Sequence, residues 1–229
     1  MTAPALLDLL RGRLIVSCQA VAPSPLRRSD IIAALAECAV LGGAAGVRID
    51  SPNDVAATRA RVRAPIVGLF KRRADSPIYI TPRFEDAQAV ARAGAEIVAL
   101  QATRERALHG DPLPQLIDRI HAECRVLVMA DVSTLDEGAA AEAAGADIIA
   151  TTMAGYTPHS RQMPGPDLRL VEELAAHVSV PIVAEGRIQT PDDAAAARRA
   201  GAWAVVVGRA ITMPDAITAR FARAVEDAT

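Results

Sequence analysis

Short apolar segments rich in β-branched residues alternate along the whole chain with alanine-rich stretches of helical character. Such alternation is typical of βα units arranged around a parallel sheet. The pattern predicts eight strands, near Leu14–Cys18, Gly46–Ile49, Ile66–Leu69, Glu96–Leu100, Val126–Ala130, Asp147–Ala150, Ile182–Ala184 and Ala204–Val207.

One helix is predicted after each strand, and several of these helices begin with a hydroxyl N-cap followed by acidic residues. Thr134 and Thr190 are two such N-caps. The predicted helices span Ser29–Leu41, Pro52–Arg61, Phe84–Ala93, Pro112–Glu123, Leu135–Ala144, Asp167–His177, Pro191–Ala200 and Pro214–Asp227.

The segments that lead into the strands repeat. Gly94, Gly145 and Gly201 each stand between two alanines before an even-numbered strand, as expected of a glycine that ends a helix. Eight βα units in a chain close to ~250 residues predict a (β/α)8 TIM barrel. We expect one domain over residues 1–229. An open doubly wound sheet is disfavoured, because the first strand ends in Ser17-Cys18-Gln19-Ala20 and no GxGxxG follows it.

Composition and charge narrow the class of protein. The chain is 51% hydrophobic and 23% charged, which is enough to bury a sizeable core. A net charge of −2 without long blocks of one sign argues against nucleic acid as a partner. No apolar run approaches the ~20 residues of a membrane span. Three cysteines without CxxC spacing, and a start without signal-peptide features, predict a cytoplasmic protein without a metal site.

The only lysine among 25 basic residues is Lys71, and the other 24 are arginines. Lysine differs from arginine in that its ammonium can lose a proton near neutral pH when it is buried. Lys71 is therefore either a chance surface lysine or a residue whose chemistry arginine cannot supply.

Polar residues follow the predicted strands, at the end of a barrel where active sites lie. Lys71 and Glu185 come directly after two apolar strands, so both side chains are expected in one mouth, where they could act as acid and base. The other polar positions at the strand ends are Gln19, Arg48, Asp50, Gln101, Asp131, Thr151, Thr152 and Arg209.

Glycines and arginines after the last two strands form a second candidate cluster. Gly186 with Arg187, and Gly208 with Arg209, stand where many barrels bind phosphate through backbone N–H groups. A phosphorylated small molecule is the ligand that this placement predicts. The segment Tyr156–Asp167 is long for a βα loop and is interpreted as an active-site loop.

Six segments at the predicted strand ends, in this order, resemble the N-acylmannosamine-6-phosphate 2-epimerases. They are Ser17-Cys18-Gln19-Ala20, Gly46-Val47-Arg48-Ile49, Gly68-Leu69-Phe70-Lys71-Arg72 with Ile80-Thr81-Pro82, Met129-Ala130-Asp131-Val132-Ser133-Thr134, Thr151-Thr152-Met153-Ala154-Gly155-Tyr156-Thr157 and Ile182-Val183-Ala184-Glu185-Gly186-Arg187-Ile188.

The resemblance implies interconversion of N-acetylmannosamine 6-phosphate and N-acetylglucosamine 6-phosphate in sialic acid breakdown, without a metal or organic cofactor. It implies Lys71 and Glu185 as the catalytic pair, with proton removal and return at C2. We expect a phosphorylated N-acyl amino sugar as substrate and a homodimer as the assembly. The implied substrate-binding residues are Gln19, Arg48, Asp131, Thr152 and Tyr156, and the implied phosphate-binding residues are Gly186, Arg187, Gly208 and Arg209.

The chain departs from the family near its last strand. The family commonly reads Gly-Gly-Ala-Ile-Thr-Arg-Pro, whereas this chain reads Gly208-Arg209-Ala210-Ile211-Thr212-Met213-Pro214. Either Arg209 reaches the phosphate from a new position, or the pocket has lost one phosphate contact. This displaced arginine motivates one alternative function, a sugar-phosphate-binding regulator without turnover. A second alternative is an aldolase that forms a Schiff base on Lys71, because a desolvated lysine serves either purpose.

Overall fold

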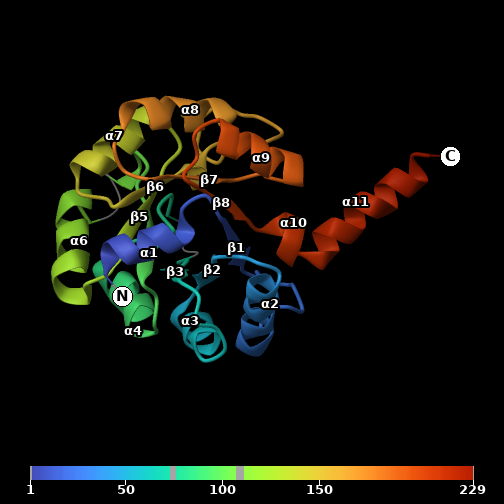
Figure 1. The fold of residues 1–229 in the computed structure, drawn as a ribbon, viewed down its shortest axis with the longest axis horizontal. Helices are drawn as coiled ribbons and strands as arrows, with labels where there is room; N and C mark the ends of the chain where they lie inside the picture. Colours follow the sequence, from blue (N-terminus) through green and yellow to red (C-terminus); the bar gives the residue numbers. More distant parts are fainter. Residues whose placement is uncertain (1, 73–75, 107–110, 229) are drawn as a thin grey trace.

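A closed barrel of eight parallel strands forms the centre of the protein in the computed structural model, which describes residues 2–72, 76–106 and 111–228 (Figure 1). The strands are paired in sequence order, and β8 pairs with β1 to close the barrel. The predicted (β/α)8 fold is therefore confirmed. The strands are β1 Leu14–Cys18, β2 Gly46–Asp50, β3 Ile66–Leu69, β4 Ile97–Gln101, β5 Leu127–Asp131, β6 Ile148–Ala150, β7 Ile182–Glu185 and β8 Ala204–Val207.

Three predicted strand starts, Glu96, Val126 and Asp147, lie one residue before the observed strands. The carboxylates of Glu96 and Asp147 each accept a hydrogen bond from the backbone of a neighbouring strand. Glu96 Oε2 accepts from the Ile66 N–H at 2.9 Å, and Asp147 Oδ2 accepts from the Val128 N–H at 2.8 Å. These acidic residues therefore cap strand starts.

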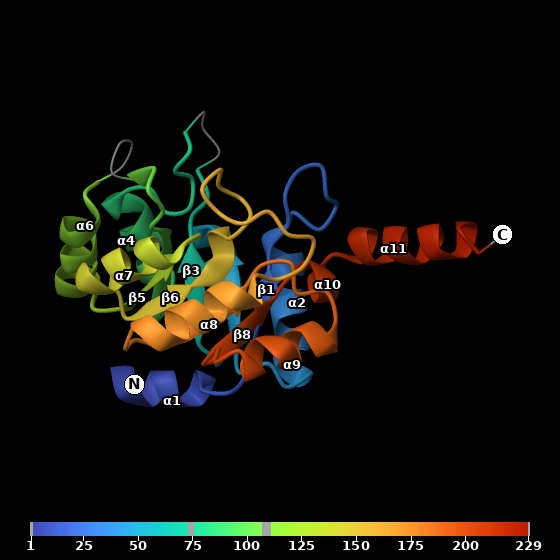
Figure 2. The same ribbon diagram turned by 90° about the horizontal axis from the view of Figure 1, so that it is seen from above.

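Helices surround the barrel, and the loops at one end form its mouth (Figure 2). The capping boxes at Thr134 and Thr190 are present, with Glu137 and Asp193 as the third helical residues. In the described part of the chain, no helix is long and apolar enough to cross a membrane. The helices are α1 Ala3–Leu10, α2 Ser29–Leu41, α3 Pro52–Arg59, α4 Phe84–Arg92, α6 Leu113–Arg119 with a π-helical turn Ile120–Cys124, α7 Leu135–Ala143, α8 Leu168–His177, α9 Pro191–Arg199, α10 Arg209–Thr212 and α11 Pro214–Glu226, with a 3₁₀ turn at Thr151–Met153.

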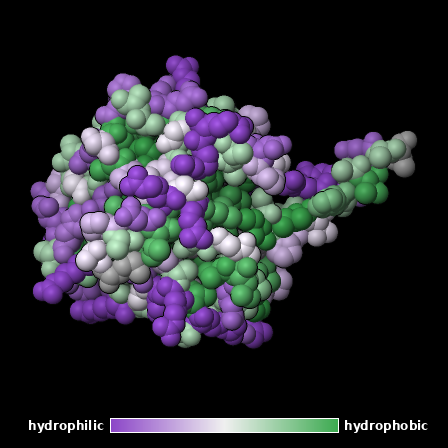
Figure 3. Space-filling model, in the orientation of Figure 1, coloured by the Kyte–Doolittle hydropathy of each residue, from purple (hydrophilic) through white to green (hydrophobic). Residues whose placement is uncertain are grey.

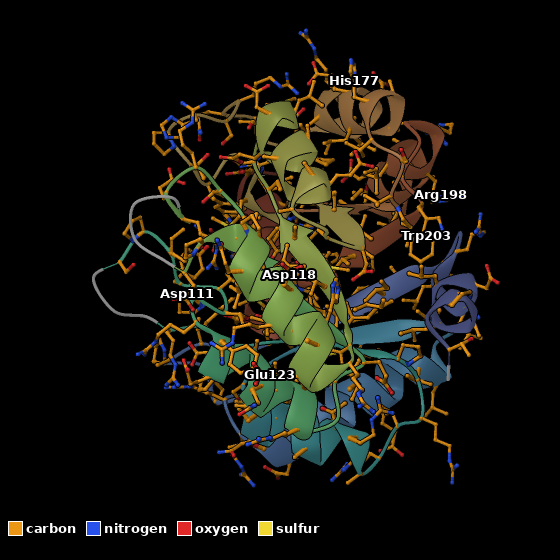
Figure 4. The ribbon with its side chains drawn as sticks, turned by 90° about the vertical axis from the view of Figure 1, so that its left-hand side faces the viewer. Asp111, Asp118, Glu123, His177, Arg198 and Trp203 are labelled. Carbon is orange, nitrogen blue, oxygen red and sulfur yellow. The ribbon has the colours of Figure 1, made fainter. Side chains whose placement is uncertain are left out.

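Helix α1, which the strand pattern did not predict, closes the end of the barrel opposite the mouth (Figure 2). Leu6 and Leu10 are buried against the inner barrel residues, among them Ile15. Trp203, which precedes β8, packs on the same cluster (Figure 4). The ligand-accessible opening is therefore at the carboxyl ends of the strands.

Helix α11 projects away from the barrel, unlike the other helices of the outer layer (Figure 1). None of its described side chains is buried. By contrast, α6 and the π-helical turn that follows it, which contain Asp118 and Glu123, pack over the outside of the barrel (Figure 4). The eighth predicted helix thus exists but does not cover its own barrel.

Candidate active site

A cavity of about 590 Å³ opens at the carboxyl ends of the strands. The chain places the predicted pair Lys71 and Glu185 in this cavity, together with most of the other predicted site residues. The predicted residues that line it are Gln19, Arg48, Lys71, Thr152, Tyr156, Glu185, Gly186, Arg187, Gly208 and Arg209.

Arg48 is the centre of a buried charge cluster at the floor of the cavity. Its side chain is 1% exposed and forms a bidentate ion pair with Asp131, at 3.0 Å and 2.6 Å. The Nη1 atom also donates to Glu185 Oε2 at 2.6 Å. Thr152 Oγ1 bridges the two carboxylates, at 2.7 Å from Asp131 Oδ1 and 3.2 Å from Glu185 Oε2. Four predicted site residues from three strands and one turn are therefore locked together.

Glu185 is held in an environment that favours its neutral form. Burial raises the pKa of its carboxyl above the ordinary value, the positive charge of Arg48 opposes this rise, and the negative charge of Asp131 adds to it. The positive charge of Lys71 also lowers the pKa, so the two predicted catalytic groups lie within electrostatic reach of each other. The net shift is upward, and the carboxyl can therefore exchange a proton closer to neutral pH.

The Lys71 side chain points across the mouth to the end of β1. Its Nζ donates to Gln19 Oε1 at 2.6 Å, and Gln19 Nε2 donates to Ser17 Oγ at 2.9 Å. The Lys71 backbone N–H is held by Asp50 Oδ1 at 2.9 Å. Both the backbone and the amine of Lys71 are thus fixed by neighbouring strands, as a proton-transferring group requires.

The arginines of the predicted phosphate cluster have different roles in the structure. Arg187 donates to the carbonyl oxygens of Ala154, Gly155 and Gly165, so its guanidinium ties down the long loop after β6. Gly155 has a φ of 74°, and a Cβ at this position would displace the guanidinium from its present place, so the observed arrangement depends on glycine. Arg209 is exposed at the start of α10 and lines the cavity.

Tyr156 stands at the rim of the same cavity. Its side chain is 58% exposed, and the Arg187 guanidinium lies 5.2 Å from its ring centroid. His159, in the same loop, pairs with Glu105 at 3.2 Å and lines a different cavity. The predicted active-site loop therefore contributes Tyr156 to the mouth, whereas His159 faces elsewhere.

Several cavity residues were missed by sequence reasoning. Ser17 lies inside the predicted first strand, one residue before its end, so it is not among the residues that follow a strand. Tyr79 lies in the segment between β3 and α4, eight residues after Lys71 and far from a predicted strand end. Arg220 and Arg223 come from α11, whose position no strand-end rule predicts. Among the residues that the structure describes, no group of three or more His, Cys, Asp or Glu could hold a metal ion.

Comparisons with known proteins agree on one family. A family model described as "Putative N-acetylmannosamine-6-phosphate epimerase" matches residues 32–227. A relative from Thermosynechococcus vestitus named "Putative N-acetylmannosamine-6-phosphate 2-epimerase" is 52% identical over 204 residues, which cover 89% of each chain. A relative of the same name from Clostridium perfringens is 44% identical and covers 94% of this chain and 98% of its own.

A solved structure supports the same grouping. The N-acetylmannosamine-6-phosphate 2-epimerase from Clostridium perfringens superposes with a TM-score of 0.91 and 42% identity, covering 95% of both chains. The match of the family model, the sequence identities and the superposition all extend over most of this chain. The chain therefore belongs to the N-acetylmannosamine-6-phosphate epimerase family.

Proposed function

We propose that the protein is an isomerase that interconverts N-acetylmannosamine 6-phosphate and N-acetylglucosamine 6-phosphate. The observation that carries this proposal is the single mouth in which Lys71 and Glu185 lie beside the buried Arg48–Asp131 pair. The family relationship favours this reaction over the aldolase and regulator alternatives. The family resemblance further implies a role in sialic acid breakdown, and the three cysteines without CxxC spacing favour a reducing, cytoplasmic setting.

The two sugars differ only in configuration at C2, so the chemistry reduces to removing and returning one proton. The C2–H bond breaks, and its electron pair delocalises toward the anomeric carbon and oxygen of the open-chain sugar. Lys71 first loses its ammonium proton and then, as a neutral amine, takes the C2 proton in this scheme, and Glu185 transfers protons at the sugar oxygens or on the opposite face. The guanidinium of Arg48 stabilises the negative charge that develops in the site. Return of a proton to the other face of C2 completes the reaction.

The direct test follows conversion of N-acetylmannosamine 6-phosphate by NMR, with unphosphorylated N-acetylmannosamine as the matched substrate. We expect the glucosamine epimer to form until both sugars reach equilibrium, and the unphosphorylated sugar to react far more slowly. Binding of the phosphorylated sugar without turnover would contradict the epimerase and support the regulator.

Arg209 is proposed to supply the phosphate contact that the family commonly draws from the position of Met213. Both residues line the cavity, so an arginine at either position has access to the ligand. A charge-assisted hydrogen bond contributes roughly 1.5–3 kcal/mol, which corresponds to about a 10- to 150-fold change in binding. Arg209→Ala is expected to raise KM for N-acetylmannosamine 6-phosphate by that factor, while kcat changes little.

The control restores the family pattern. In the double variant Arg209→Gly with Met213→Arg, we expect KM to return to within a few-fold of the unmodified value. Steady-state kinetics of both variants measure this. A KM for Arg209→Ala within twofold of that of the unmodified protein would show that Arg209 does not bind the phosphate.

We also propose that the protein is a homodimer in which each chain's α11 packs on the barrel of its partner. Ile217, Phe221 and Val225 recur every four residues and form an apolar stripe along α11, and Phe221 and Val225 are 69% and 72% exposed. The fold offers a matching surface. A groove of about 460 Å³ lies between α9 and the β8–β1 side of the barrel, lined by residues that include Leu14, Ala194, Val205, Val207 and Ile211.

The groove occupies the place where the helix after the last strand of a regular barrel would pack. Figure 3 shows apolar surface beside the base of the projecting helix. Because α11 of the same chain points away from this groove, a second copy of α11, with its exposed apolar stripe, is the occupant that matches the apolar lining. Exchange of an identical element between two copies forms a closed symmetric dimer.

The dimer proposal predicts the effect of one added charge. Phe221→Glu is expected to convert a particle of twice the chain mass of 24.0 kDa into a monomer, because the carboxylate cannot be buried in an apolar groove. Ala222→Glu adds the same charge beside the stripe and is expected to leave the dimer intact. Light scattering coupled to size-exclusion chromatography measures both masses. A monomeric unmodified protein, or a dimeric Phe221→Glu variant, would contradict the exchange.

A further inference from the structure

Lys71 lies on a short antiparallel ladder that leaves the barrel after β3. Residues 70–72 run outward and residues 79–81 return, and Lys71 pairs with Ile80 across the ladder. The ladder is closed on both sides of Lys71 by hydrogen bonds from the Arg72 N–H to Tyr79 O at 2.8 Å and from the Thr81 N–H to Phe70 O at 2.9 Å. The position of the lysine therefore depends on what holds the returning strand.

Gln101, at the end of β4, holds this returning strand from below. The side chain is 1% exposed, and its Oε1 accepts from the Tyr79 N–H at 3.1 Å. Its Nε2 donates to Pro77 O at 2.9 Å, and its backbone N–H donates to Ile80 O at 3.0 Å. The side-chain amide and the backbone N–H of one buried glutamine thus bind the segment at three points around Ile80, the residue that pairs with Lys71.

Arg106 completes the anchorage. Its side chain is 2% exposed, and its guanidinium donates to the carbonyl oxygens of Gln101, Thr81 and Pro82. Thr81 has a φ of 45°, a left-handed conformation that is strained for a branched residue. Arg106 therefore binds the segment where its backbone needs to be held in place.

The cost of burying Arg106 points to a role beyond stability. The hydrogen bonds of its guanidinium go to neutral carbonyl oxygens, and burial lowers the pKa of the group to about 10, a shift that the negative charge of Asp111 partly opposes. A buried cation that bonds only neutral carbonyls is expensive compared with a neutral side chain of similar size. The benefit visible in the structure is the set of hydrogen bonds that hold the segment paired with Lys71.

We propose that Arg106 is a positioning residue for the reaction. Together with Gln101, it holds residues 79–81 in place, and these residues in turn fix the position of the Lys71 amine. The inference rests on the proposed role of Lys71 in proton transfer. Neither Arg106 nor Gln101 lines the cavity, so both act through the ladder. Misplacement of a reacting group by about 1 Å costs on the order of 100-fold in rate.

The test compares Arg106→Gln with Arg104→Gln, which changes the same residue type at an exposed position two residues away. We expect Arg106→Gln to lower kcat by about 10- to 100-fold and to change KM less than threefold. Arg104→Gln is expected to keep both values. A role in stability alone would lower the melting temperature and leave kcat per folded molecule unchanged.

The chain also allows Lys71 to be observed directly, because it is the only lysine. Protein labelled with ¹³Cε-lysine gives one side-chain NMR signal, whose chemical shift and pH titration report the surroundings of that amine. Both are expected to change in Arg106→Gln and to stay the same in Arg104→Gln. This measurement needs no turnover, so it distinguishes a failure of this inference from a failure of the proposed function.

Gln101→Met provides a second variant if Arg106→Gln does not fold, since it removes two side-chain hydrogen bonds to the same strand without unpairing a charge. The same loss of kcat and the same change of the lysine signal are expected. A folded variant of either residue with kcat within twofold of the unmodified protein, and with an unchanged lysine signal, would overturn the inference.

Discussion

Lys71→Met is expected to lower kcat for epimer formation by about 100- to 10,000-fold, the range that a positioned acid–base group contributes. Methionine has a similar length but no proton to exchange. The amine is held by Gln19 and lies near Glu185, so its loss removes the base without removing a core residue. NMR of the sugar mixture measures the rate, and circular dichroism verifies the fold.

Lys71→Arg separates charge from proton transfer. Arginine keeps the positive charge but does not lose its proton in proteins, so we expect this variant to be nearly as inactive as Lys71→Met. Retention of most activity by Lys71→Arg would show that the site needs only a positive charge. Borohydride treatment of the unmodified protein with substrate adds a further control: a covalent adduct on Lys71 would favour the aldolase alternative.

Glu185→Gln is expected to abolish turnover to a similar extent while the fold becomes no less stable. The amide cannot exchange protons as a carboxyl does, which explains the loss of kcat. It can still accept the hydrogen bond from Arg48, and Arg48 keeps its bidentate pair with Asp131. Because the site disfavours the charged form of Glu185, a neutral replacement removes an unfavourable charge.

The sign of the pH dependence follows from the raised pKa of Glu185. Its contribution to stability is fully present below the ordinary pKa of the unfolded chain and is lost as the pH rises through the higher pKa of the folded protein. Glu185→Gln does not titrate, so its melting temperature should exceed that of the unmodified protein increasingly as the pH rises over this interval. Thermal unfolding at a series of pH values measures the difference.

Asp131→Asn is the contrasting control at the same cluster. Asp131 is fully buried, and both of its carboxylate oxygens accept hydrogen bonds from the Arg48 guanidinium. Removing one partner of a buried ion pair costs about 3–5 kcal/mol, so this variant should melt well below the unmodified protein. A large loss of stability in Glu185→Gln would show that Glu185 is a structural partner of Arg48 in the same sense.

Part of the site is predictable from the rule that active-site residues of a barrel lie at the carboxyl ends of its strands. Parallel strands bring their carboxyl ends to one mouth, and Lys71 and Glu185 were found because each directly follows an apolar run. The rule cannot show that Arg48 binds Asp131, since 83 positions separate them and only the barrel brings them together. The sequence also does not show that the Arg187 side chain binds the loop after β6, because this orientation depends on the space beside Gly155.

The two ends of the chain show a different limit. Helix α1 was missed because its buried residues, Leu6 and Leu10, form no long periodic pattern. Helix α11 was predicted, but the spacing of Ile217, Phe221 and Val225 indicates only that one face of the helix is apolar. A pattern of this kind does not tell which barrel, its own or a partner's, provides that contact.

The proposed function depends on proton exchange at C2, and reaction in D2O tests this step most directly. N-acetylmannosamine 6-phosphate is incubated with the unmodified protein and with Lys71→Met, and the C2 proton signals of both sugars are followed. We predict that the unmodified protein forms N-acetylglucosamine 6-phosphate with deuterium at C2, and that Lys71→Met forms both the epimer and the deuterated sugar at least about 100-fold more slowly. Epimer formation that retains the original C2 proton, or exchange that persists at a comparable rate without Lys71, would contradict the account.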